Sequence, residues 1–381
     1  MHLALYRRFR PQTFEEVIGQ EHIVSTLVNQ VKTGKISHAY LFTGSRGTGK
    51  TSCAKIFARA INCLDPVNGS PCGKCGNCLA LKSSNNIDIF EIDAASNNGV
   101  NEIRELRETV KYPPVNGKYK VYIIDEVHML TDSAFNALLK TLEEPPEHVV
   151  FILATTEVYK LPATILSRCM RFDFRLVSVA ELKSLLKKIF DNCQIRYDEQ
   201  SVEAIAIAGD GSVRDMLSIA DCVVGYCQDN ITYEKTLKIL GASDKSQIYN
   251  LVKFIKDKDF GNILEAINEI YESGKNLTSL CKELEVCFKN LIVIKSCNNY
   301  RQVLNVSEDE CHKLNELAEG ISNENLISFM QKFSEVELQL KYAISPKTLI
   351  ELACLECASI DNVKKNWFLS STRLLTSQIL I

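Results

Sequence analysis

A glycine-rich segment between a strand-like run and a helical run constrains this chain more than any other feature. The segment follows the apolar run Ala39–Thr43 and precedes the helix-forming run Ser52–Ala60. Glycine lets backbone N–H groups curl around phosphate oxygens, and the start of a helix adds positive partial charge. The order strand, loop, helix is typical of a phosphate loop in a parallel α/β sheet. The loop residues are Gly44, Ser45, Arg46, Gly47, Thr48, Gly49, Lys50 and Thr51.

Two side chains of this loop predict phosphate chemistry. Lys50 is placed to reach the β- and γ-phosphates of a nucleotide, and the Thr51 hydroxyl is placed to ligate Mg²⁺. The alternative is a glycine-rich turn that matches the pattern by accident. The flanking strand and helix favour the phosphate loop, so we expect a nucleoside triphosphate site.

A second run ends in two carboxylates. The buried strand expected over Val121–Ile124 is followed by Asp125 and Glu126, which places both at the carboxyl edge of the sheet. Asp125 suits coordination of Mg²⁺, and Glu126 suits polarising an attacking water. The alternative is an exposed acidic pair that caps a helix. We interpret His128 as a packing or relay residue rather than a metal ligand.

Four of the fifteen cysteines are clustered with spacings of eight, two and two residues. Without a signal-like N-terminus the thiols are expected to be reduced, which favours metal ligation over disulfides. Four thiolates close a tetrahedral structural Zn²⁺ site, although an iron–sulfur cluster uses the same ligands. Cys354 and Cys357 repeat the short spacing inside an apolar helical run, so we expect them in a core. The expected zinc ligands are Cys63, Cys72, Cys75 and Cys78.

Composition narrows the class of protein. No apolar run reaches 18 residues, and the first eleven residues carry three arginines without an apolar signal core. We therefore expect a soluble, cytoplasmic protein. The net charge of −3 from 44 basic and 47 acidic residues means that nucleic acid could be held only by a local basic patch.

The 381 residues divide into regions of different pattern. Residues 1–178 alternate strands and helices, residues 179–242 form short amphipathic helices, and residues 243–363 continue as helices alone. Residues 364–381 are a tail without a clear period. The strands expected in the first region are Ala39–Thr43, Ile87–Ile92, Val121–Ile124 and Val149–Ala154.

Several strings, in chain order, resemble the bacterial DNA polymerase III gamma/tau family, the AAA+ ATPases of sliding-clamp loaders. The resemblance covers about residues 4–242, and the cysteine cluster after the phosphate-loop helix is its most specific mark. Residues 243–363 are similar to the collar domain of the family only in length and helicity. The strings are Gly44–Thr51, Cys63–Cys78, Ile124–Leu130, Phe135–Pro146, Ala154–Thr156 and Leu166–Cys169.

The resemblance implies a fold and a domain plan. It implies an α/β AAA+ P-loop ATPase domain over 1–178 with a zinc-binding insertion at about 62–79. A small helical lid domain over 179–242 and an all-α collar domain over 243–363 would follow. The longest members of the family carry further C-terminal domains, so the chain is expected to be a short gamma-type form or a fragment.

The resemblance also implies roles for single residues. Thr155 or Thr156 would be a sensor of the γ-phosphate, although a threonine that only ends a strand is the alternative. Arg168 would be a finger that reaches the ATP of a neighbouring subunit, with a surface salt bridge as its alternative. Arg214 would be the sensor arginine of the lid. Arg10 and Ile18 would belong to the adenine side of the pocket.

The activity and partners implied are those of a clamp loader. ATP binding and hydrolysis would open a ring-shaped sliding clamp and load it on primed DNA, in a pentamer with delta-type and delta′-type subunits. No polymerase site is expected in this chain. A structural adaptor that does not hydrolyse ATP and a branch-migration helicase motor are the alternatives. The first would lack the phosphate-loop and acidic residues, and the second gives no reason for four clustered cysteines.

One local basic surface is a candidate for DNA. Asn98 lies just before the helical run Val100–Val110, Arg104 and Arg107 lie within that run, and Lys140 lies on a later helix. The resemblance places these elements inside a spiral of subunits, where they would follow the DNA backbone without reading bases. The alternative is a solvated helix whose arginines pair with Glu102, Glu105 and Glu108.

Overall fold

The computed structural model describes residues 4–82, 87–227, 230–240, 245–274, 276–297, 300, 304, 308–340, 343 and 345–360. The chain forms two compact units, residues 1–240 and residues 241–381. The expected tail at 364–381 lies outside the described residues. Among the helices of the described part, none is long and apolar enough to cross a membrane.

The first unit is built on a parallel sheet of five strands in the order β2-β3-β4-β1-β5. Strand β4 separates β1 from β3, so the two strands that precede the expected chemistry are not neighbours. This order creates a topological switch point at the carboxyl end of β1, where α/β sheets bind ligands. The strands are β1 (Ala39–Thr43), β2 (Ile89–Asp93), β3 (Lys120–Asp125), β4 (Val149–Thr155) and β5 (Met170–Asp173).

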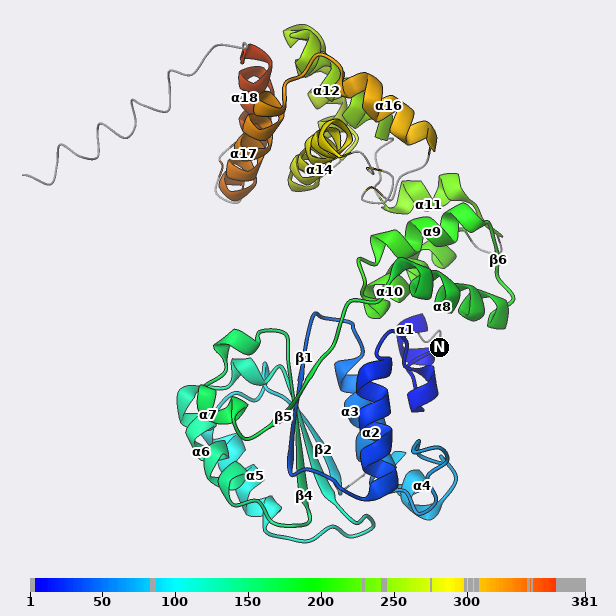
Figure 1. Ribbon diagram of the computed structural model, residues 1–381, viewed down its shortest axis with the longest axis vertical. Helices are drawn as coiled ribbons and strands as arrows, with labels where there is room; N and C mark the ends of the chain where they lie inside the picture. Colours follow the sequence, from blue (N-terminus) through cyan, green and yellow to red (C-terminus); the bar gives the residue numbers. More distant parts are fainter. Residues whose placement is uncertain are drawn as a thin grey trace, which may run out of the picture. The chain divides into compact units, whose positions relative to one another are not determined.

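Helices cover both faces of this sheet, as Figure 1 shows. Successive residues of β3 belong to different cores, because strand side chains alternate between the faces. Val121 and Ile123 pack in the core with α2 and α3, whereas Tyr122 and Ile124 pack in the core with α5, α6 and α7. The helices are α2 (Glu21–Thr33), α3 (Lys50–Ala60), α5 (Val100–Val110), α6 (Asp132–Glu143) and α7 (Ala163–Leu166).

The parallel α/β sheet confirms the fold class, and the first four strands were expected from apolar runs. Strand β5 was not expected. Only Phe172 of its four residues is buried, because β5 lies at the edge of the sheet and pairs with β1 alone. An edge strand with three exposed side chains has no apolar run for sequence reasoning to detect.

A small helical region completes the first unit. Its helices are α8 (Val179–Asn192), α9 (Glu199–Ala208), α10 (Val213–Cys227) and α11 (Tyr233–Leu240). Ser178 and Glu181 form a capping box that fixes the start of α8. The short helix α1 (Leu5–Arg8) packs on α10, where the Leu5 N–H donates to Asp221 Oδ2 at 2.7 Å.

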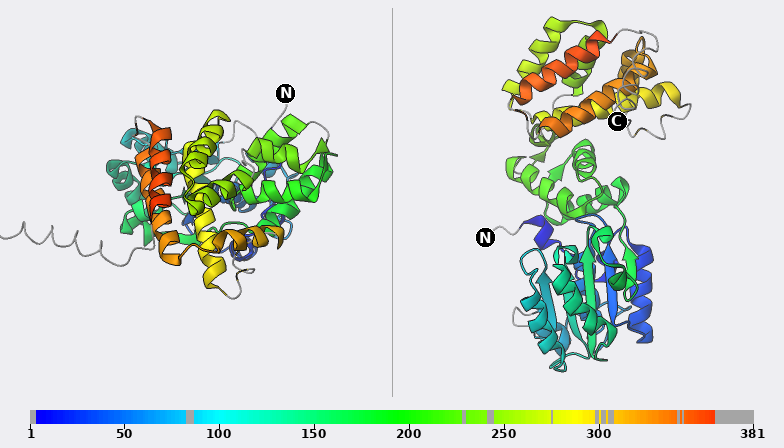
Figure 2. Two further views of the ribbon diagram at one scale, coloured as in Figure 1. Left: turned by 90° about the horizontal axis from the view of Figure 1, so that it is seen from above. Right: turned by 90° about the vertical axis from the view of Figure 1, so that its left-hand side faces the viewer.

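The second unit is helical throughout its described residues (Figure 2). Its core includes Phe288 and Phe333, and Cys354 and Cys357 are buried within it, which confirms the expectation that this pair packs in a core. The helices are α12 (Lys245–Asp257), α13 (Phe260–Glu272), α14 (Leu277–Ser296), α16 (Glu308–Ala318), α17 (Asn323–Leu340) and α18 (Pro346–Ser359).

Candidate nucleotide site and cysteine cluster

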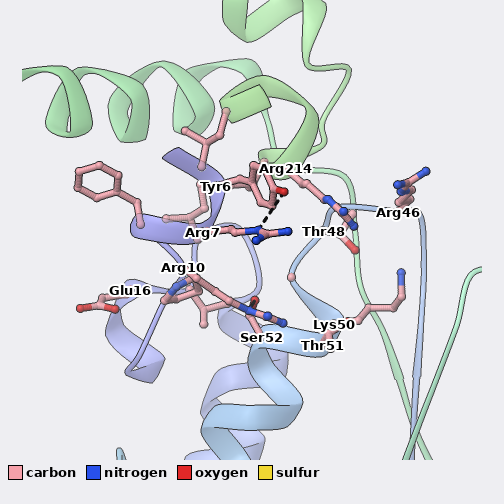
Figure 3. Close-up of a pocket in the computed structure, with 18 of the residues that line it drawn as sticks. Tyr6, Arg7, Arg10, Glu16, Arg46, Thr48, Lys50, Thr51, Ser52 and Arg214 are labelled. Atoms are coloured by element: carbon pink, nitrogen blue, oxygen red, sulfur yellow. Dashed lines mark hydrogen bonds between the residues drawn. The ribbon is translucent and has the colours of Figure 1, made fainter. Parts of the chain in front are cut away.

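A cavity of about 680 Å³ lies at the phosphate loop. Its walls come from the N-terminal segment, the loop itself and the helical region that begins at α8, as Figure 3 shows, together with Glu91 of β2 and the end of β3. Of the expected site residues, those that line it are Arg10, Ile18, Arg46, Gly47, Thr48, Gly49, Lys50, Thr51, Asp125, Glu126 and Arg214.

The loop is closed around Lys50, which begins α3. The Lys50 ammonium donates to the carbonyl oxygens of Gly44 and Ser45 at 2.7 and 2.8 Å, and the residue is only 6% exposed. Burial lowers the pKa of Lys50, although the nearby carboxylates of Glu126 and Asp125 act in the opposite direction. A buried ammonium inside a ring of backbone groups is suited to binding a polyanion.

Gly47 brings the loop into contact with the helical region. Its φ of 76° is left-handed, and a Cβ built there would lie 1.9 Å from Ser212 Oγ. The Gly47 carbonyl accepts the Val213 N–H at 3.1 Å. Only glycine allows this approach, which places Arg214, one residue further, at the mouth of the cavity.

The loop also reaches the end of β3. Thr51 Oγ1 donates to Asp125 Oδ2 at 2.7 Å, and Asp125 Oδ1 accepts the Glu126 N–H at 3.0 Å. Glu126 has a φ of 47°, which is uncommon for a residue other than glycine. Strand β3 therefore ends in a sharp turn, and the carboxylates of Asp125 and Glu126 point in different directions. A hydroxyl and a carboxylate in contact fit a site for Mg²⁺, which prefers oxygen ligands.

Thr155 and Thr156 have different partners at the end of β4. The Thr156 hydroxyl donates to Glu126 Oε2 at 3.1 Å, whereas the Thr155 hydroxyl lies 3.0 Å from His128 Nδ1. The other ring nitrogen, Nε2, lies 2.9 Å from Glu157 Oε2. His128 thus joins Thr155 and Glu157, which agrees with its interpretation as a relay residue.

The N-terminal segment forms one wall of the cavity. Arg10 Nε donates to Ser52 Oγ on α3 at 3.0 Å. The Arg214 guanidinium lies 5.5 Å from the centre of the Tyr6 ring, within the range of a cation–π contact. Arg7, in the segment that the resemblance assigns to the adenine side, lines the cavity as well, whereas sequence reasoning did not single out Glu16, Leu185 or Leu217, which also line it. Leu185 and Leu217 lie on amphipathic helices and carry no motif, so no sequence signal distinguishes them from core residues.

Of the expected nucleotide-site residues that the structure describes, those that do not line the cavity are Gly44, Ser45, Thr155, Thr156 and Arg168. The two threonines lie behind Glu126 and His128, as their hydrogen bonds show. Arg168 forms an ion pair with Glu143 at 2.8 Å and also donates to the Thr164 carbonyl at 2.8 Å. Its side chain is 32% exposed, so Arg168 is at the surface of this chain.

The four clustered cysteines converge as their spacing predicts. Their sulfur atoms all lie within 4.8 Å of one another, with 3.9 Å between the sulfurs of Cys63 and Cys75 and 4.0 Å between those of Cys72 and Cys78. Four sulfurs at about 2.3 Å from a tetrahedral Zn²⁺ would be about 3.8 Å apart. The cluster could therefore hold zinc with little rearrangement.

The backbone supports thiolates in this cluster. The N–H groups of Cys72 and Cys75 donate to the sulfurs of Cys63 and Cys72, each at 3.3 Å. Desolvation raises the pKa of Cys75, but hydrogen bonds from Leu64, Cys78 and Cys72 outweigh it and lower the pKa to about 6. The pKa of Cys72 is lowered as well, whereas burial raises the pKa of Cys63 and of Cys78, so the surroundings favour the thiolate at Cys72 and Cys75 alone.

The DNA candidates lie on one face of the sheet. Arg104 on α5 and Lys140 on α6 are exposed, as is Asn98, and α5 packs on α6. Glu108 pairs with Lys111, and neither Arg104 nor Arg107 forms an ion pair with a described residue.

Three family models match consecutive parts of the chain. The model described as DNA polymerase III, delta subunit, matches residues 19–178. The model of the DNA polymerase III clamp loader subunit, ATPase lid domain, matches residues 181–229. The model of DNA polymerase III subunits gamma and tau domain III matches residues 231–366. The first two matches fall within the first two regions that the sequence pattern separates, whereas the third begins at residue 231, inside the second region, and ends at residue 366.

Curated relatives match nearly the whole chain. DNA polymerase III subunit tau of Bacillus subtilis is 45% identical over 354 residues, which are 93% of this chain and 62% of that protein. The chain thus spans under two thirds of that relative. DNA polymerase III subunit gamma of Buchnera aphidicola is 34% identical over 358 residues, which are 94% of this chain and 97% of that protein. With 34% identity to a relative matched over nearly its full length, the chain belongs to the DNA polymerase III subunit gamma/tau family.

Proposed function

We propose that the chain binds ATP with Mg²⁺ in the cavity at the phosphate loop and hydrolyses it as a subunit of a bacterial clamp loader. The observation that carries this proposal is the contact of Thr51 with Asp125 beside the buried Lys50 ammonium. This arrangement offers a hydroxyl and a carboxylate for Mg²⁺ and a cation for the phosphates. The family membership of the chain supports the same activity.

Each residue of the site has a role in this proposal. The loop N–H groups and Lys50 would bind the β- and γ-phosphates, and Thr51 and Asp125 would hold Mg²⁺, which would supply positive charge beside the phosphates. Glu126 orients the attacking water and accepts its proton. Thr156 holds the Glu126 carboxylate through its hydrogen bond and thereby positions it. Thr155 acts through His128, whose Nδ1 lies 3.5 Å from the same Glu126 oxygen, Oε2.

Two arginines connect the site to other parts of the assembly. Arg214 belongs to the helical region and lines the cavity, so ATP would join this region to the sheet. Arg168 is too far from the cavity of its own chain to line it, and its surface position supports a role at the site of a neighbouring subunit. There its guanidinium would stabilise phosphate charge during hydrolysis.

We propose the same domain plan that the resemblance implies, with an ATPase domain at 1–178, a lid at 179–242 and a collar at 243–363. The cluster of Cys63, Cys72, Cys75 and Cys78 would hold one structural Zn²⁺. The proposed partners are delta-type and delta′-type clamp loader subunits, the sliding clamp, and primed DNA contacted through its backbone. Cytoplasmic location follows from this role in replication.

The two alternatives fit less well. A subunit without hydrolysis is disfavoured because Lys50, Thr51 and Asp125 are all placed at the cavity. A branch-migration motor shares the ATP site, but it gives no account of four converging thiols or of the match to a gamma and tau domain.

The test is ATP turnover by the chain assembled with delta-type and delta′-type subunits, measured with primed DNA, with a sliding clamp, and with both. A clamp loader is expected to hydrolyse ATP fastest when both are present. Stimulation by branched DNA without any effect of the clamp would favour the helicase motor instead. If the chain bound no ATP under any of these conditions, the result would favour the structural adaptor that does not hydrolyse ATP.

A further inference from the structure

The segment of about residues 62–79 that carries the four clustered cysteines is called the cysteine module below. A short hairpin lies inside it, between Cys63 and Cys72. Val67 and Ser70 exchange two backbone hydrogen bonds of 2.9 and 2.8 Å. The residues between them, Asn68 and Gly69, have φ values of 52° and 86°. Two left-handed residues in the order Asn-Gly are typical of the tightest hairpin turns. The module therefore carries a turn of fixed shape, with its two ends held near metal-ligand positions.

This hairpin contacts the N-terminal part of the chain at two points. Ser70 is 3% exposed, and its hydroxyl accepts the Phe14 N–H at 3.0 Å while it donates to Glu15 Oε2 at 2.8 Å. A Cβ at Gly69 would lie 2.8 Å from Val28 Cγ1 on α2, so the tip of the hairpin is in close contact with that helix. The hairpin is thus seated on the chain segment that leads into the nucleotide cavity.

The same segment forms a wall of the cavity on the side away from Lys50 (Figure 3). Glu16 and Ile18, which line the cavity, follow directly after the residues that Ser70 binds. On its other side the segment is tied to α3, where Arg59 donates to Gln12 at 2.9 and 3.1 Å. This N-terminal segment would face the base of a bound nucleotide. It is anchored from two sides, by the phosphate-loop helix α3 and by the cysteine module.

We propose that the cysteine module positions the base side of the nucleotide cavity through Ser70, so that metal binding and ATP binding are coupled. This inference rests on the proposed ATP function and adds a role for the metal module within it. Ser70 is a positioning residue, since it lies behind the wall rather than in the cavity. Without its hydroxyl the buried Phe14 N–H loses its partner, which favours displacement of the segment.

The test compares two ligands that share the phosphates but not the base. ATP and inorganic triphosphate are titrated into the wild-type chain and into Ser70→Ala. We expect Ser70→Ala to bind ATP about five-fold more weakly, the effect of about one hydrogen bond, with triphosphate affinity unchanged. Amide hydrogen exchange is expected to become faster between Gln12 and Ile18. Ser70→Thr, which keeps the hydroxyl, is expected to restore both.

The matched control is Ser25→Ala on α2, which removes an exposed serine hydroxyl bonded only to the His22 carbonyl. It is expected to behave as wild type. If Ser70→Ala does not fold, the exposed Glu15→Ala variant removes the second hydrogen bond of Ser70 and leaves its bond with the Phe14 N–H. A smaller loss of ATP affinity with faster exchange at the same amides then supports the proposal, and no change in either overturns it.

The metal arm uses the wild-type chain before and after chelation. Chelation is expected to weaken the binding of ATP but not that of triphosphate. In Ser70→Ala it is expected to have little further effect, because both changes act on the same connection between the module and the cavity. Equal weakening of both ligands, or fully additive effects, would overturn the coupling. If the wild-type chain bound neither ligand, the proposed function would fail, whereas unchanged exchange between Gln12 and Ile18 would refute the anchor alone.

Discussion

Thr51 and Asp125 are in contact through a hydrogen bond of 2.7 Å, although they follow strands that are not neighbours in the sheet. Strand β4 lies between β1 and β3, and the loop after β1 reaches across the end of β4. The contact sets a hydroxyl and a carboxylate side by side at the cavity. This is the geometric basis of the proposed Mg²⁺ site.

Lys50→Ala is expected to weaken ATP binding about 100-fold or more, because a charge-assisted contact to two phosphates is lost. Zinc content is expected to stay close to wild type, because Lys50 bonds to Gly44 and Ser45 of its own loop. Isothermal titration with ATP measures the first and metal analysis the second. Lys32→Ala, an exposed lysine on α2, is the control, and retained ATP turnover in Lys50→Ala would contradict the assignment.

Glu126→Gln is expected to keep ATP binding and to slow hydrolysis by about 10²–10⁴-fold, the range for loss of a general base. Thr156→Val is expected to slow it by less, because the carboxylate is retained but loses the hydrogen bond that holds it. Single-turnover hydrolysis with excess protein separates chemistry from binding. Weaker ATP binding with unchanged chemistry would place Glu126 outside the reaction.

Arg168→Ala is expected to leave ATP binding intact and to reduce hydrolysis in the assembled complex by about 10³-fold. Glu143→Gln breaks the same ion pair but keeps the arginine, so it serves as the matched control. Complexes that mix Arg168→Ala with Lys50→Ala chains test action between subunits. If activity depends on Arg168 in the chain that binds ATP, the proposed role at a neighbouring site is wrong.

Metal analysis is expected to find one zinc per chain and no iron. Cys75→Ser is expected to lose the metal and to lower the melting temperature, because zinc holds the two ends of the hairpin module together. Cys222→Ser removes an exposed cysteine far along the sequence and is the control. A visible absorption band from bound iron would instead support an iron–sulfur cluster.

Charge reversal at Arg104 and Lys140 together is expected to weaken binding of primed DNA equally for unrelated sequences. The slope of log affinity against log salt should become shallower by about one to two units, which corresponds to the loss of about one to two phosphate contacts. The control reverses Lys32 and Lys35, which are exposed at α2 on the opposite face of the sheet. An unchanged slope with intact DNA-stimulated hydrolysis would assign the DNA surface to other residues.

The sequence by itself was sufficient for the features that depend on local order. The phosphate loop can be recognised from a strand, glycines and a helix in succession. The cysteine cluster can be recognised from spacings that let tight turns bring the sulfurs together. Helix α5 begins and ends at the residues of the predicted helical run Val100–Val110, since its apolar periodicity is complete within that segment. Strand β5 was missed because an edge strand buries only one of its side chains.

The tertiary structure decided the relations between distant segments. Strand order brings Thr51 to Asp125, and only the folded sheet shows that Thr156 holds Glu126 while Thr155 contacts His128. The link from Ser70 to Phe14 joins residues 56 positions apart and has no motif. Such contacts depend on how elements pack in three dimensions, and a linear pattern carries information only about neighbours along the chain.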